Sequence, residues 1–378
     1  MWALRSIGRS ASNSAAPSSR LVRLRHLVAR GFRNLSDLDC ELPQQGLVLL
    51  GANAQGKTNM LEALYYSVLF RSFRGAPDQE VARFEGPGFQ VEARIEGGPV
   101  ADIGTAYATQ GRRKRILVEG QEPGRVADAV GGWLAVSFLP DDVGLATGAA
   151  AQRRAYLDRL LSLADRQYLR SLARYRAALA QRNSALRQGR SDLACAFDAP
   201  LAAAGAAVVR MREQWAAGAD EQFAAEFDCL GEVAPARLRY RGTEGLAEVH
   251  AWTAALAAAL PRDQARGMTT IGPHRDDLIL EVGGRPLREF GSNGQQRGAA
   301  VALKLIELSA LRAARGTEPA LLLDDVFAAF DADRQRRLAR RLLETPERQV
   351  FLTAPRRDEL PPDLALPVWR MVAGKVTT

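Results

Sequence analysis

The segment Gly51-Ala-Asn-Ala-Gln-Gly-Lys-Thr58 constrains this chain more than any other, because it fits the pattern G-x-x-x-x-G-K-[ST]. The apolar run Gly46–Leu50 precedes it and predicts a buried strand, and residues 59–70 follow it and predict a helix. In this order of strand, glycine-rich turn and helix, backbone N–H groups and the positive end of the helix hold phosphate groups. The segment therefore predicts a nucleotide-phosphate site within an α/β domain.

The side chains of this turn have different predicted roles. Lys57 is expected to place a positive charge on the β- and γ-phosphates, which makes it one of two predicted catalytic residues. The Thr58 hydroxyl is expected to bind Mg²⁺. The predicted nucleotide-binding residues of the turn and the helix start are Gly51, Ala52, Asn53, Ala54, Gln55, Gly56, Lys57, Thr58 and Asn59.

A second apolar run, Ala320-Leu-Leu-Leu-Asp-Asp325, predicts a buried strand that ends in two carboxylates. Ligands of α/β sheets bind beyond the carboxyl ends of strands. Asp324 is therefore predicted to bind Mg²⁺, and Asp325 to polarise the attacking water as the second catalytic residue. Because adjacent residues of a strand face opposite sides, we expect these two side chains to point apart.

A helical module separates the two halves of this predicted site. Residues 151–188 contain neither Pro nor Gly and predict one long helix, followed by a polar break and a second apolar helical stripe over residues 201–230. The apolar residues of the first helix recur at helical spacing and are Tyr168, Leu172, Tyr175, Leu179 and Leu186. Two such helices pack antiparallel. We expect an α/β head, split in sequence, from which a helical arm projects.

Other segments complete the predicted head. Residues 21–28 alternate like an edge strand, and residues 91–118 predict short strands joined by a basic turn at 112–115. In Gly291-Ser-Asn-Gly-Gln-Gln-Arg297, Ser292 can cap a helix, Gly294 allows close approach of a ligand, and Gln295 begins the helix. An ordinary helix start is the alternative interpretation of this segment.

These segments, in this order, resemble the ATP-binding-cassette heads of chromosome-maintenance proteins, and in particular the RecF family of bacterial recombinational repair proteins. The resemblance covers nearly the whole chain after residue 21. The segments that carry it are Gly31-Phe-Arg-Asn34, residues 51–59, Arg71-Ser-Phe-Arg74, Phe138-Leu-Pro-Asp-Asp142, Gln152-Arg-Arg-Ala-Tyr-Leu-Asp158, Gln181-Arg-Asn183, Gly272-Pro-His-Arg-Asp-Asp-Leu278, Gly294-Gln-Gln-Arg297 and Leu323-Asp-Asp-Val326.

The resemblance implies a P-loop ATPase head with a β-rich edge, formed by residues 21–140 and 263–378, and an inserted arm domain over residues 141–262. Residues 1–20, rich in Ser and Arg, are then an extension that the family lacks. The implied cofactors are ATP and Mg²⁺. Two heads of this family enclose two ATP molecules, so Ser292, Gly294 and Gln295 of one copy would reach the nucleotide of the other.

The resemblance also implies a cellular role. The family acts on double-stranded and gapped DNA, works with RecR and RecO, and promotes loading of the RecA recombinase. The expected activity is weak, DNA-stimulated ATP hydrolysis that reopens an ATP-dependent homodimer. The expected location is the cytoplasm, at the nucleoid, and no apolar run approaches the about 20 residues that span a bilayer.

This sequence departs from the family pattern at three places. Ala54 stands where the turn usually has Gly, Asn293 replaces a common Gln, and Ala328-Ala-Phe-Asp331 stands where Ser-Glu-Leu-Asp is usual. An Ala is unfavourable where φ is positive, so nucleotide affinity would be reduced. The third departure leads to an alternative function, an ATP-binding scaffold head that hydrolyses little and mainly binds other proteins.

The predicted DNA contacts rest on charge. The chain carries a formal net charge of +8, which favours a polyanionic partner. Residues 151–190 carry ten Arg, and sequence-neutral DNA binding requires mainly such phosphate contacts, although a solvated helix face is the alternative. The predicted DNA-binding residues are Arg74, Arg112, Arg113, Lys114 and Arg115, and contact with the nucleotide is the alternative for Arg74.

Overall fold

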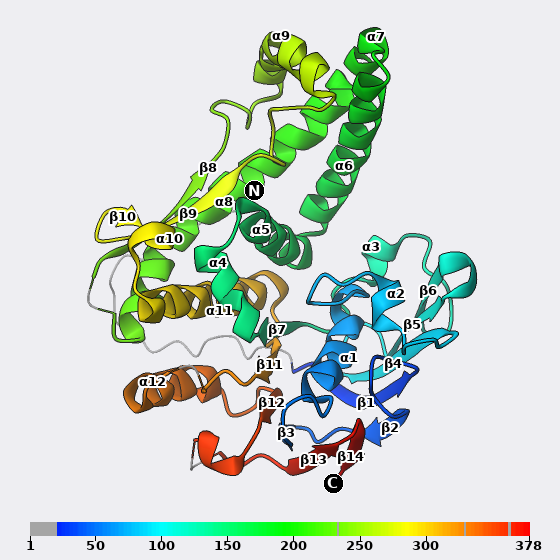
Figure 1. Cartoon of the computed structure of the whole chain (residues 1–378), viewed down its shortest axis with the longest axis vertical. Coiled ribbons are helices and arrows are strands. Elements are labelled where there is room, and N and C mark those ends of the chain that lie inside the picture. The colour runs from blue at the N-terminus through cyan, green and yellow to red at the C-terminus, as the bar shows by residue number, and fades with distance from the viewer. Residues whose placement is uncertain (1–20, 233, 329, 362–363) are drawn as a thin grey trace.

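The computed structural model describes residues 21–232, 234–328, 330–361 and 364–378 (Figure 1). The expected extension, residues 1–20, lies outside these ranges. The chain forms an α/β head with two sheets, and a helical arm projects from it (Figure 1). This arrangement confirms the predicted fold class. Within the described ranges, the helices are too short or too polar to cross a membrane.

The central sheet of the head has six strands in the order β14-β13-β3-β12-β11-β7, parallel except for β14. Its strands are β3 (Gly46–Leu50), β7 (Ala135–Phe138), β11 (Ala320–Asp324), β12 (Val350–Ala354), β13 (Val368–Val372) and β14 (Lys375–Thr377). The strands β3, β11 and β12 are mostly apolar and almost fully buried, as expected of parallel strands covered on both faces. Their parallel register places the chain after Leu50 beside Asp324, at one edge of the sheet.

A second, antiparallel sheet has the order β2-β1-β4-β5-β6. Its strands are β1 (Arg23–Arg30), β2 (Leu38–Glu41), β4 (Gly88–Glu96), β5 (Asp102–Ala108) and β6 (Arg113–Val118). The edge-strand prediction for residues 21–28 is wrong, since β1 pairs with both β2 and β4. The basic-turn prediction is also wrong for residues 113–115, which begin β6 at the sheet edge. Charged side chains are common on such exposed edges, so a basic run does not by itself indicate a turn.

The helices of the head cover these sheets. They are α1 (Lys57–Leu69), α2 (Asp78–Val81), α3 (Val126–Ala129), α4 (Gly144–Thr147), α10 (Leu287–Phe290), α11 (Asn293–Arg315) and α12 (Ala332–Leu343), with 3₁₀ turns η1 (Gln110–Arg112), η2 (Pro140–Val143) and η3 (Arg357–Glu359). The helix α1 contacts strands of both sheets (Figure 1). Most of its side chains are therefore buried, including the charged Glu62.

The arm consists of five helices and a small sheet in the order β10-β9-β8 (Figure 1). Its elements are α5 (Ala150–Ala164), α6 (Arg166–Arg187), α7 (Ser191–Cys195), α8 (Asp198–Cys229), α9 (Val249–Arg266), β8 (Ala236–Arg241), β9 (Asp277–Val282) and β10 (Arg285–Pro286). The helices α6 and α8 pack against each other, as the two apolar stripes predict. The expected domain boundary after residue 262 falls inside α9.

The prediction of one uninterrupted helix over residues 151–188 is wrong. The chain breaks at Asp165, which has extended backbone angles (φ −137°, ψ 118°). Its side chain accepts a hydrogen bond of 2.6 Å from the Gln167 N–H and so caps α6. Aspartate competes for backbone N–H groups in this way and favours a helix start over a helix interior. The apolar stripe of α6 is nonetheless buried, with Leu179 only partly so.

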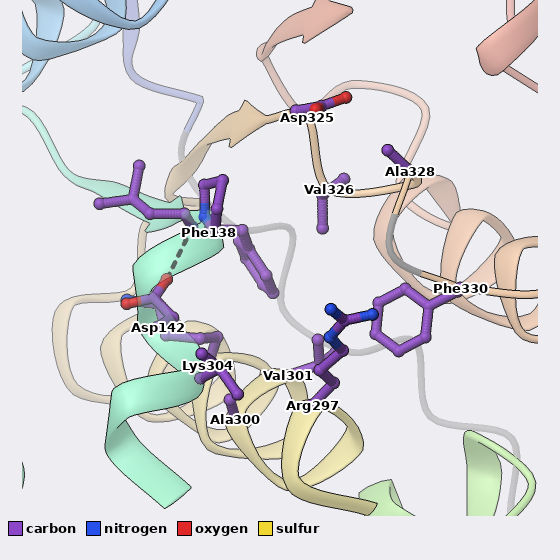
Figure 2. A pocket seen from close by; sticks show the side chains of 13 residues that line it. Phe138, Asp142, Arg297, Ala300, Val301, Lys304, Asp325, Val326, Ala328 and Phe330 are labelled. Carbon is purple, nitrogen blue, oxygen red and sulfur yellow. Dashed lines mark hydrogen bonds between the residues drawn. The ribbon is translucent and has the colours of Figure 1, made fainter. Parts of the chain in front are cut away.

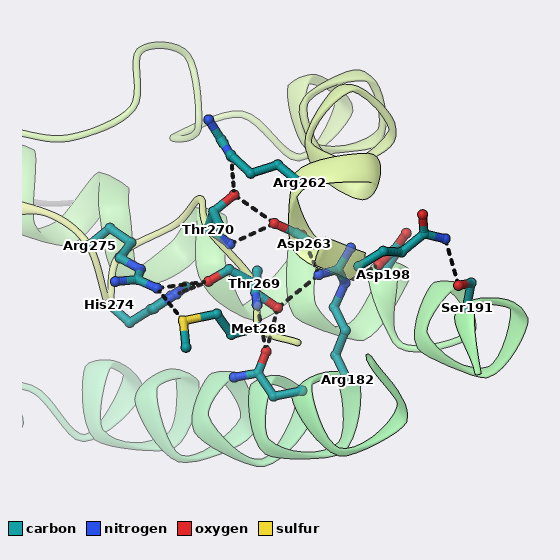
Figure 3. A network of polar contacts seen from close by, with 12 residues as sticks. Arg182, Ser191, Asp198, Arg262, Asp263, Met268, Thr269, Thr270, His274 and Arg275 are labelled. Carbon is teal, nitrogen blue, oxygen red and sulfur yellow. Dashed lines mark hydrogen bonds and ion pairs between the residues drawn. The ribbon is translucent and has the colours of Figure 1, made fainter. Parts of the chain in front are cut away.

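Buried ion pairs hold the arm together (Figure 3). Arg182 of α6 is fully buried and donates to Asp263 of α9 at 2.7 Å, to Thr269 at 2.8 Å and to Asp198 at 2.8 Å. A buried charge without a partner costs several kcal/mol, so these three contacts fix how the ends of α6, α8 and α9 meet. Arg182 is therefore a structural residue and no candidate for DNA contact.

The segment Gly272-Pro-His-Arg-Asp-Asp-Leu278 connects elements of the arm through similar contacts. Asp277 accepts two hydrogen bonds from Arg153 of α5, at 2.8 and 3.0 Å. His274 contacts the Tyr175 hydroxyl at 2.6 Å and the Thr269 carbonyl at 2.9 Å. These contacts give the segment a structural explanation that its sequence did not reveal.

Candidate functional site

A cavity of about 370 Å³ lies at the carboxyl edge of the central sheet. It is lined by Asn53, Ala54, Gly56, Lys57, Thr58, Asn59, Arg74, Pro140, Asp324, Asp325, Thr353 and Pro355. The cavity thus brings together the glycine-rich turn and the acidic strand end, which are far apart in sequence. The parallel pairing of β12 with both β3 and β11 produces this juxtaposition.

The turn before α1 has the backbone that an anion site needs. Gly56 has φ +109°, a conformation that glycine tolerates, and it provides no side-chain hydrogen bond to cap α1. The first N–H groups of α1 therefore have no side-chain acceptor and can bind phosphate oxygens. Ala54 has φ +65°, so the expected strain at this position is present.

Lys57 lies over the turn. Its Nζ donates to the carbonyl of Gly51 at 2.6 Å and to that of Ala52 at 3.0 Å. Burial lowers the pKa of Lys57, although Asp324 and Asp325 oppose this shift. The ammonium group is thus positioned within the cavity, where an anionic ligand would strengthen its charged form.

Thr58 and Asp324 touch directly. The Thr58 hydroxyl lies 2.9 and 2.8 Å from the two carboxylate oxygens of Asp324, and Thr353 donates to Asp324 at 2.6 Å. A hydroxyl and a carboxylate are the hard oxygen donors that Mg²⁺ prefers, and Mg²⁺ commonly uses only one or two carboxylates together with phosphate oxygens. This donor set fits Mg²⁺. Within the described ranges, no cluster of three or more His, Cys, Asp or Glu side chains provides an independent metal site.

Asp325 lines the same cavity as Asp324, so the expectation that the two side chains point apart is wrong. Asp325 follows the end of β11 and has φ +49°, so the alternation of a strand no longer applies to it. Burial, followed by the neighbouring Glu359 and Asp324, raises its pKa. A carboxylate with a raised pKa is a better proton acceptor, as a general base requires.

Ser292 begins α11 with a reciprocal cap. Its hydroxyl accepts from the Gln295 N–H at 3.2 Å, and the Gln295 side chain accepts from the Ser292 N–H at 3.0 Å. A Cβ at Gly294 would lie 2.3 Å from Arg334, so the Arg334 guanidinium lies against this glycine. Ser292, Gly294 and Gln295 are absent from the described residues that line the turn's own cavity.

The predicted DNA-binding residues have diverse surroundings. Arg74 lines the cavity beside the glycine-rich turn. Lys114 is half-buried, with an ion pair to Asp78 at 2.7 Å. Arg115 pairs with Glu122 on the exposed edge of the sheet, while Arg112 and Arg113 are exposed. The structure therefore does not gather these five residues on one surface.

Several Arg residues of the arm form ion pairs. Arg153 pairs with Asp277, and Arg182 with Asp263. Arg159 makes hydrogen bonds of 3.2 and 3.0 Å to Glu307 of α11. These pairs stabilise the arm and its junction with the head, so the basic composition of the arm alone does not indicate a DNA-binding face.

A second cavity, of about 300 Å³, adjoins the first and shares Pro140 and Asp325 with it (Figure 2). Its walls are η2, α11 and the segment after β11. Most of its lining is apolar, and Ala328 and Phe330 of the departing segment belong to it, while Ala329 lies outside the described residues. Ala328 and Phe330 therefore line a cavity that Asp325 also lines.

Sequence reasoning missed three residues that support the site. Thr353 of β12 holds Asp324, Asn34 bonds the carbonyl of Ala54, and Glu62 of α1 pairs with Arg74. Asn34 and Arg74 stood in segments singled out from the sequence. Nothing in the local pattern around Thr353 or Glu62 distinguishes either from an ordinary residue of a strand or helix.

No model of a known protein family matches the chain. Curated relatives do match it over most of its length. The protein "DNA replication and repair protein RecF" of Roseiflexus castenholzii is 38% identical over 371 residues, covering 88% of this chain and 93% of the relative. The protein of the same name from Anaeromyxobacter dehalogenans is 38% identical over 352 residues, covering 90% of this chain and 94% of the relative.

Solved structures agree with these relatives. "Structure of the recombination mediator protein RecF-ATP in RecFOR pathway" has a TM-score of 0.85 and 28% identity, covering 96% of this chain and 99% of the other. The Smc head domain of Pyrococcus furiosus, at 15% identity and a TM-score of 0.52, covers 94% of this chain and 96% of the other, and shares the fold. From its curated relatives, the chain belongs to the RecF family of DNA replication and repair proteins.

Proposed function

We propose that this chain is an ATP-dependent clamp on DNA that acts in recombinational repair. One observation carries the proposal: Thr58 of the glycine-rich turn touches Asp324, inside a cavity that also contains Lys57 and Asp325. This constellation has the parts of a Mg²⁺–ATP site. The ATP-containing structure of a RecF relative supports ATP as the nucleotide.

In the proposed mechanism, Lys57 and the first N–H groups of α1 bind the phosphates of ATP. Thr58 and Asp324 would hold Mg²⁺, which neutralises the charge that develops on the phosphate oxygens. Asp325 orients a water molecule and takes its proton as the water oxygen bonds to the γ-phosphorus. The bond between that phosphorus and the bridging oxygen breaks, which leaves ADP and phosphate. Arg74 lines this cavity, so we assign it to nucleotide binding instead of DNA binding.

We propose that ATP joins two copies of the chain. Ser292, Gly294 and Gln295 lie outside their own nucleotide cavity and begin a helix, so the second copy's nucleotide is the ligand available to them. ATP can favour such a dimer only through contacts that it makes in the closed state. Hydrolysis removes those contacts, and the dimer opens.

The proposed partners of the dimer are double-stranded and gapped DNA, RecR and RecO. Together with RecR and RecO, the dimer would promote loading of RecA onto the DNA. The net charge of +8 and the naming of relatives as DNA replication and repair proteins support this role. The proposed location is the cytoplasm, at the nucleoid. We propose that the division into head and arm follows the elements described above, so that the arm runs from α5 to β10 and the head comprises the described residues on either side.

Sedimentation of the protein with and without ATP, and with and without gapped duplex, tests this function. The expected result is a dimer with ATP that co-sediments with the duplex, and a monomer without ATP. A protein that stays monomeric with saturating ATP and gapped duplex would contradict the clamp.

A second candidate function is a scaffold head that binds ATP, hydrolyses it scarcely and mainly binds other proteins. The apolar side chains of Ala328 and Phe330 in the cavity that Asp325 also lines favour it, because polar groups usual in the family are missing there. Phosphate release measured with and without gapped duplex separates the two functions. Release stimulated by DNA above background supports the clamp, and background release in both samples supports the scaffold.

A further inference from the structure

Glu62 lies in α1, one turn after the predicted phosphate-binding residues, and its side chain is fully buried. Its carboxylate accepts hydrogen bonds from Arg33 at 3.0 and 2.9 Å, from Arg74 at 3.2 Å, and from the Ser72 hydroxyl. A buried carboxylate is stable only with such partners. The unusual feature is that one of its partners, Arg74, also lines the nucleotide cavity.

Arg74 is held from a second side. Its Nη1 also donates to Oδ1 of Asn59 at 2.9 Å. The Asn59 amide donates in turn to Oδ1 of Asn34 at 2.7 Å, and the Asn34 amide donates to the carbonyl of Ala54 at 3.3 Å. The two Asn side chains thus donate through nitrogen and accept through oxygen. The hydrogen bonds therefore all run in one direction, from Arg74 to Asn59, to Asn34 and to Ala54.

The contacts close into a ring. Arg33, which binds Glu62, is the covalent neighbour of Asn34. The ring therefore runs from Glu62 through Arg33, Asn34, Asn59 and Arg74 and back to Glu62. Arg33 has φ +49°, an uncommon conformation that its ion pair with Glu62 helps to hold. The ring also bonds the glycine-rich turn through Ala54.

The ring leaves Arg74 able to bind a ligand. Among described residues, the acceptors of its guanidinium, Asn59 and Glu62, are both bonded through Nη1, and a guanidinium has further donors on Nε and Nη2. The two Arg side chains outweigh the single charge of Glu62, so the ring carries a net positive charge beside the turn. Side-chain exposure is 35% for Arg74 and 0% for Glu62, which leaves Arg74 the more accessible of this pair.

We propose that Glu62 is a positioning residue, which holds Arg74 through this closed ring in the direction that binds an anionic oxygen of the nucleotide. The inference rests on the proposed function, because it takes the cavity to be the ATP site. Glu62 does not touch the nucleotide. Its effect on ATP affinity passes through Arg74 and disappears when Arg74 is absent.

A double-mutant cycle tests this role by calorimetric titration with Mg²⁺–ATP. Glu62→Gln and Arg74→Ala each weaken ATP binding about tenfold, or about 1.4 kcal/mol, because each removes or misdirects one charge-assisted hydrogen bond to the nucleotide. The double variant is no weaker than Arg74→Ala alone. Glu80→Gln is the matched control. Glu80 is exposed and accepts a hydrogen bond from Arg33 only through its backbone carbonyl, so we expect this variant to bind Mg²⁺–ATP with unchanged affinity.

Thermal unfolding separates positioning from a structural role. Glu62→Gln lowers Tm in both backgrounds, whereas it lowers ATP affinity only when Arg74 is present. An equal loss of affinity in the Arg74→Ala background, or no loss in the wild-type background, overturns the proposal. Should Glu62→Gln not fold, Ser72→Ala removes a hydrogen bond to Glu62 outside the cavity and gives a loss of about threefold that likewise requires Arg74. Wild-type protein that binds no ATP refutes the proposed function itself.

Discussion

Asp324 and Asp325 are sequence neighbours in one cavity, yet their contacts differ. Asp324 receives hydrogen bonds from Thr58 and Thr353, which leaves it suited to hold a cation. Asp325 has a raised pKa because burial and nearby carboxylates disfavour its charge. At the scale of single residues, these surroundings assign one carboxylate to Mg²⁺ and the other to proton transfer.

We predict that Asp325→Asn lowers the rate of ATP hydrolysis by about 10²–10⁴-fold, because an amide cannot accept the proton of the attacking water. ATP-dependent dimerisation persists, since the phosphate and Mg²⁺ contacts remain. Phosphate release and sedimentation measure the two properties. Asp358→Asn, a change at an exposed carboxylate of η3, is the control and leaves both unchanged. A variant that is monomeric with ATP would argue against this assignment.

His274 gives a prediction about pH. Burial lowers its pKa from 6.5 to about 4, and the neutral ring uses both nitrogens, for Tyr175 and for Thr269. The folded state therefore favours the neutral ring. Its contribution is fully present above pH 6.5 and is lost as pH falls toward 4, by about 3 kcal/mol at most.

Urea unfolding between pH 7.5 and pH 4 measures this contribution. We expect His274→Gln to be less stable than wild type at pH 7.5 and to lose less stability on acidification. The exposed His250 provides the control, since His250→Gln should follow the wild-type pH curve. Parallel curves for wild type and His274→Gln would show that the buried imidazole does not cause the pH dependence.

At the scale of elements, the arm depends on close helix packing. Gly205 of α8 faces Trp252 of α9 and Tyr175 of α6, and a Cβ there would lie 2.4 Å from the Trp252 ring. Glycine weakens a helix interior, yet here it lets an aromatic side chain pack against the helix backbone. The same helix contains Gly218, where a Cβ would meet no atom within 4 Å.

This pair gives a matched prediction. Gly205→Ala should lower the free energy of unfolding by about 1–3 kcal/mol, because overpacking outweighs the better helix propensity of Ala. Gly218→Ala should raise it by about 0.5–1 kcal/mol, since propensity alone acts there. Urea unfolding measures both. Stabilisation by Gly205→Ala would mean that Trp252 does not pack as described.

At the scale of the whole molecule, the nucleotide cavity lies at the junction of the two halves of the head. The turn before α1 comes from one half, and the strand β11 from the other. The arm between them in sequence meets the head through α5, where Arg159 pairs with Glu307 of α11. The arm and α11 are thus connected by a buried ion pair.

We predict that Lys57→Ala abolishes ATP-dependent dimerisation, because the β- and γ-phosphates lose their principal cation. Sedimentation with and without ATP measures the dimer. Arg266→Ala, at an exposed position of the arm, also removes a positive charge and should leave the ATP-dependent dimer intact. An equal yield of ATP-dependent dimer from Lys57→Ala would contradict the role of this lysine.

Much of the head could be predicted from the sequence because its signals are local. The apolar runs of β3 and β11, the glycine-rich turn and the cap at Ser292 each lie within a few consecutive residues. The break at Asp165 was equally local and was missed, because the absence of Pro and Gly outweighed the capping tendency of Asp. The position of Asp325 was missed for a different reason, since it depends on where the strand ends.

The sequence by itself determined most of the local elements of the head and predicted phosphate and metal sites at two of them, since periodicity and turn residues act over short stretches. Only the tertiary structure decided which charges meet. No local sequence pattern predicts the pairs Arg182–Asp263, Arg153–Asp277 and Arg74–Glu62. Their partners come from other elements, and burial selects one partner among many carboxylates because an unpaired buried charge is too costly.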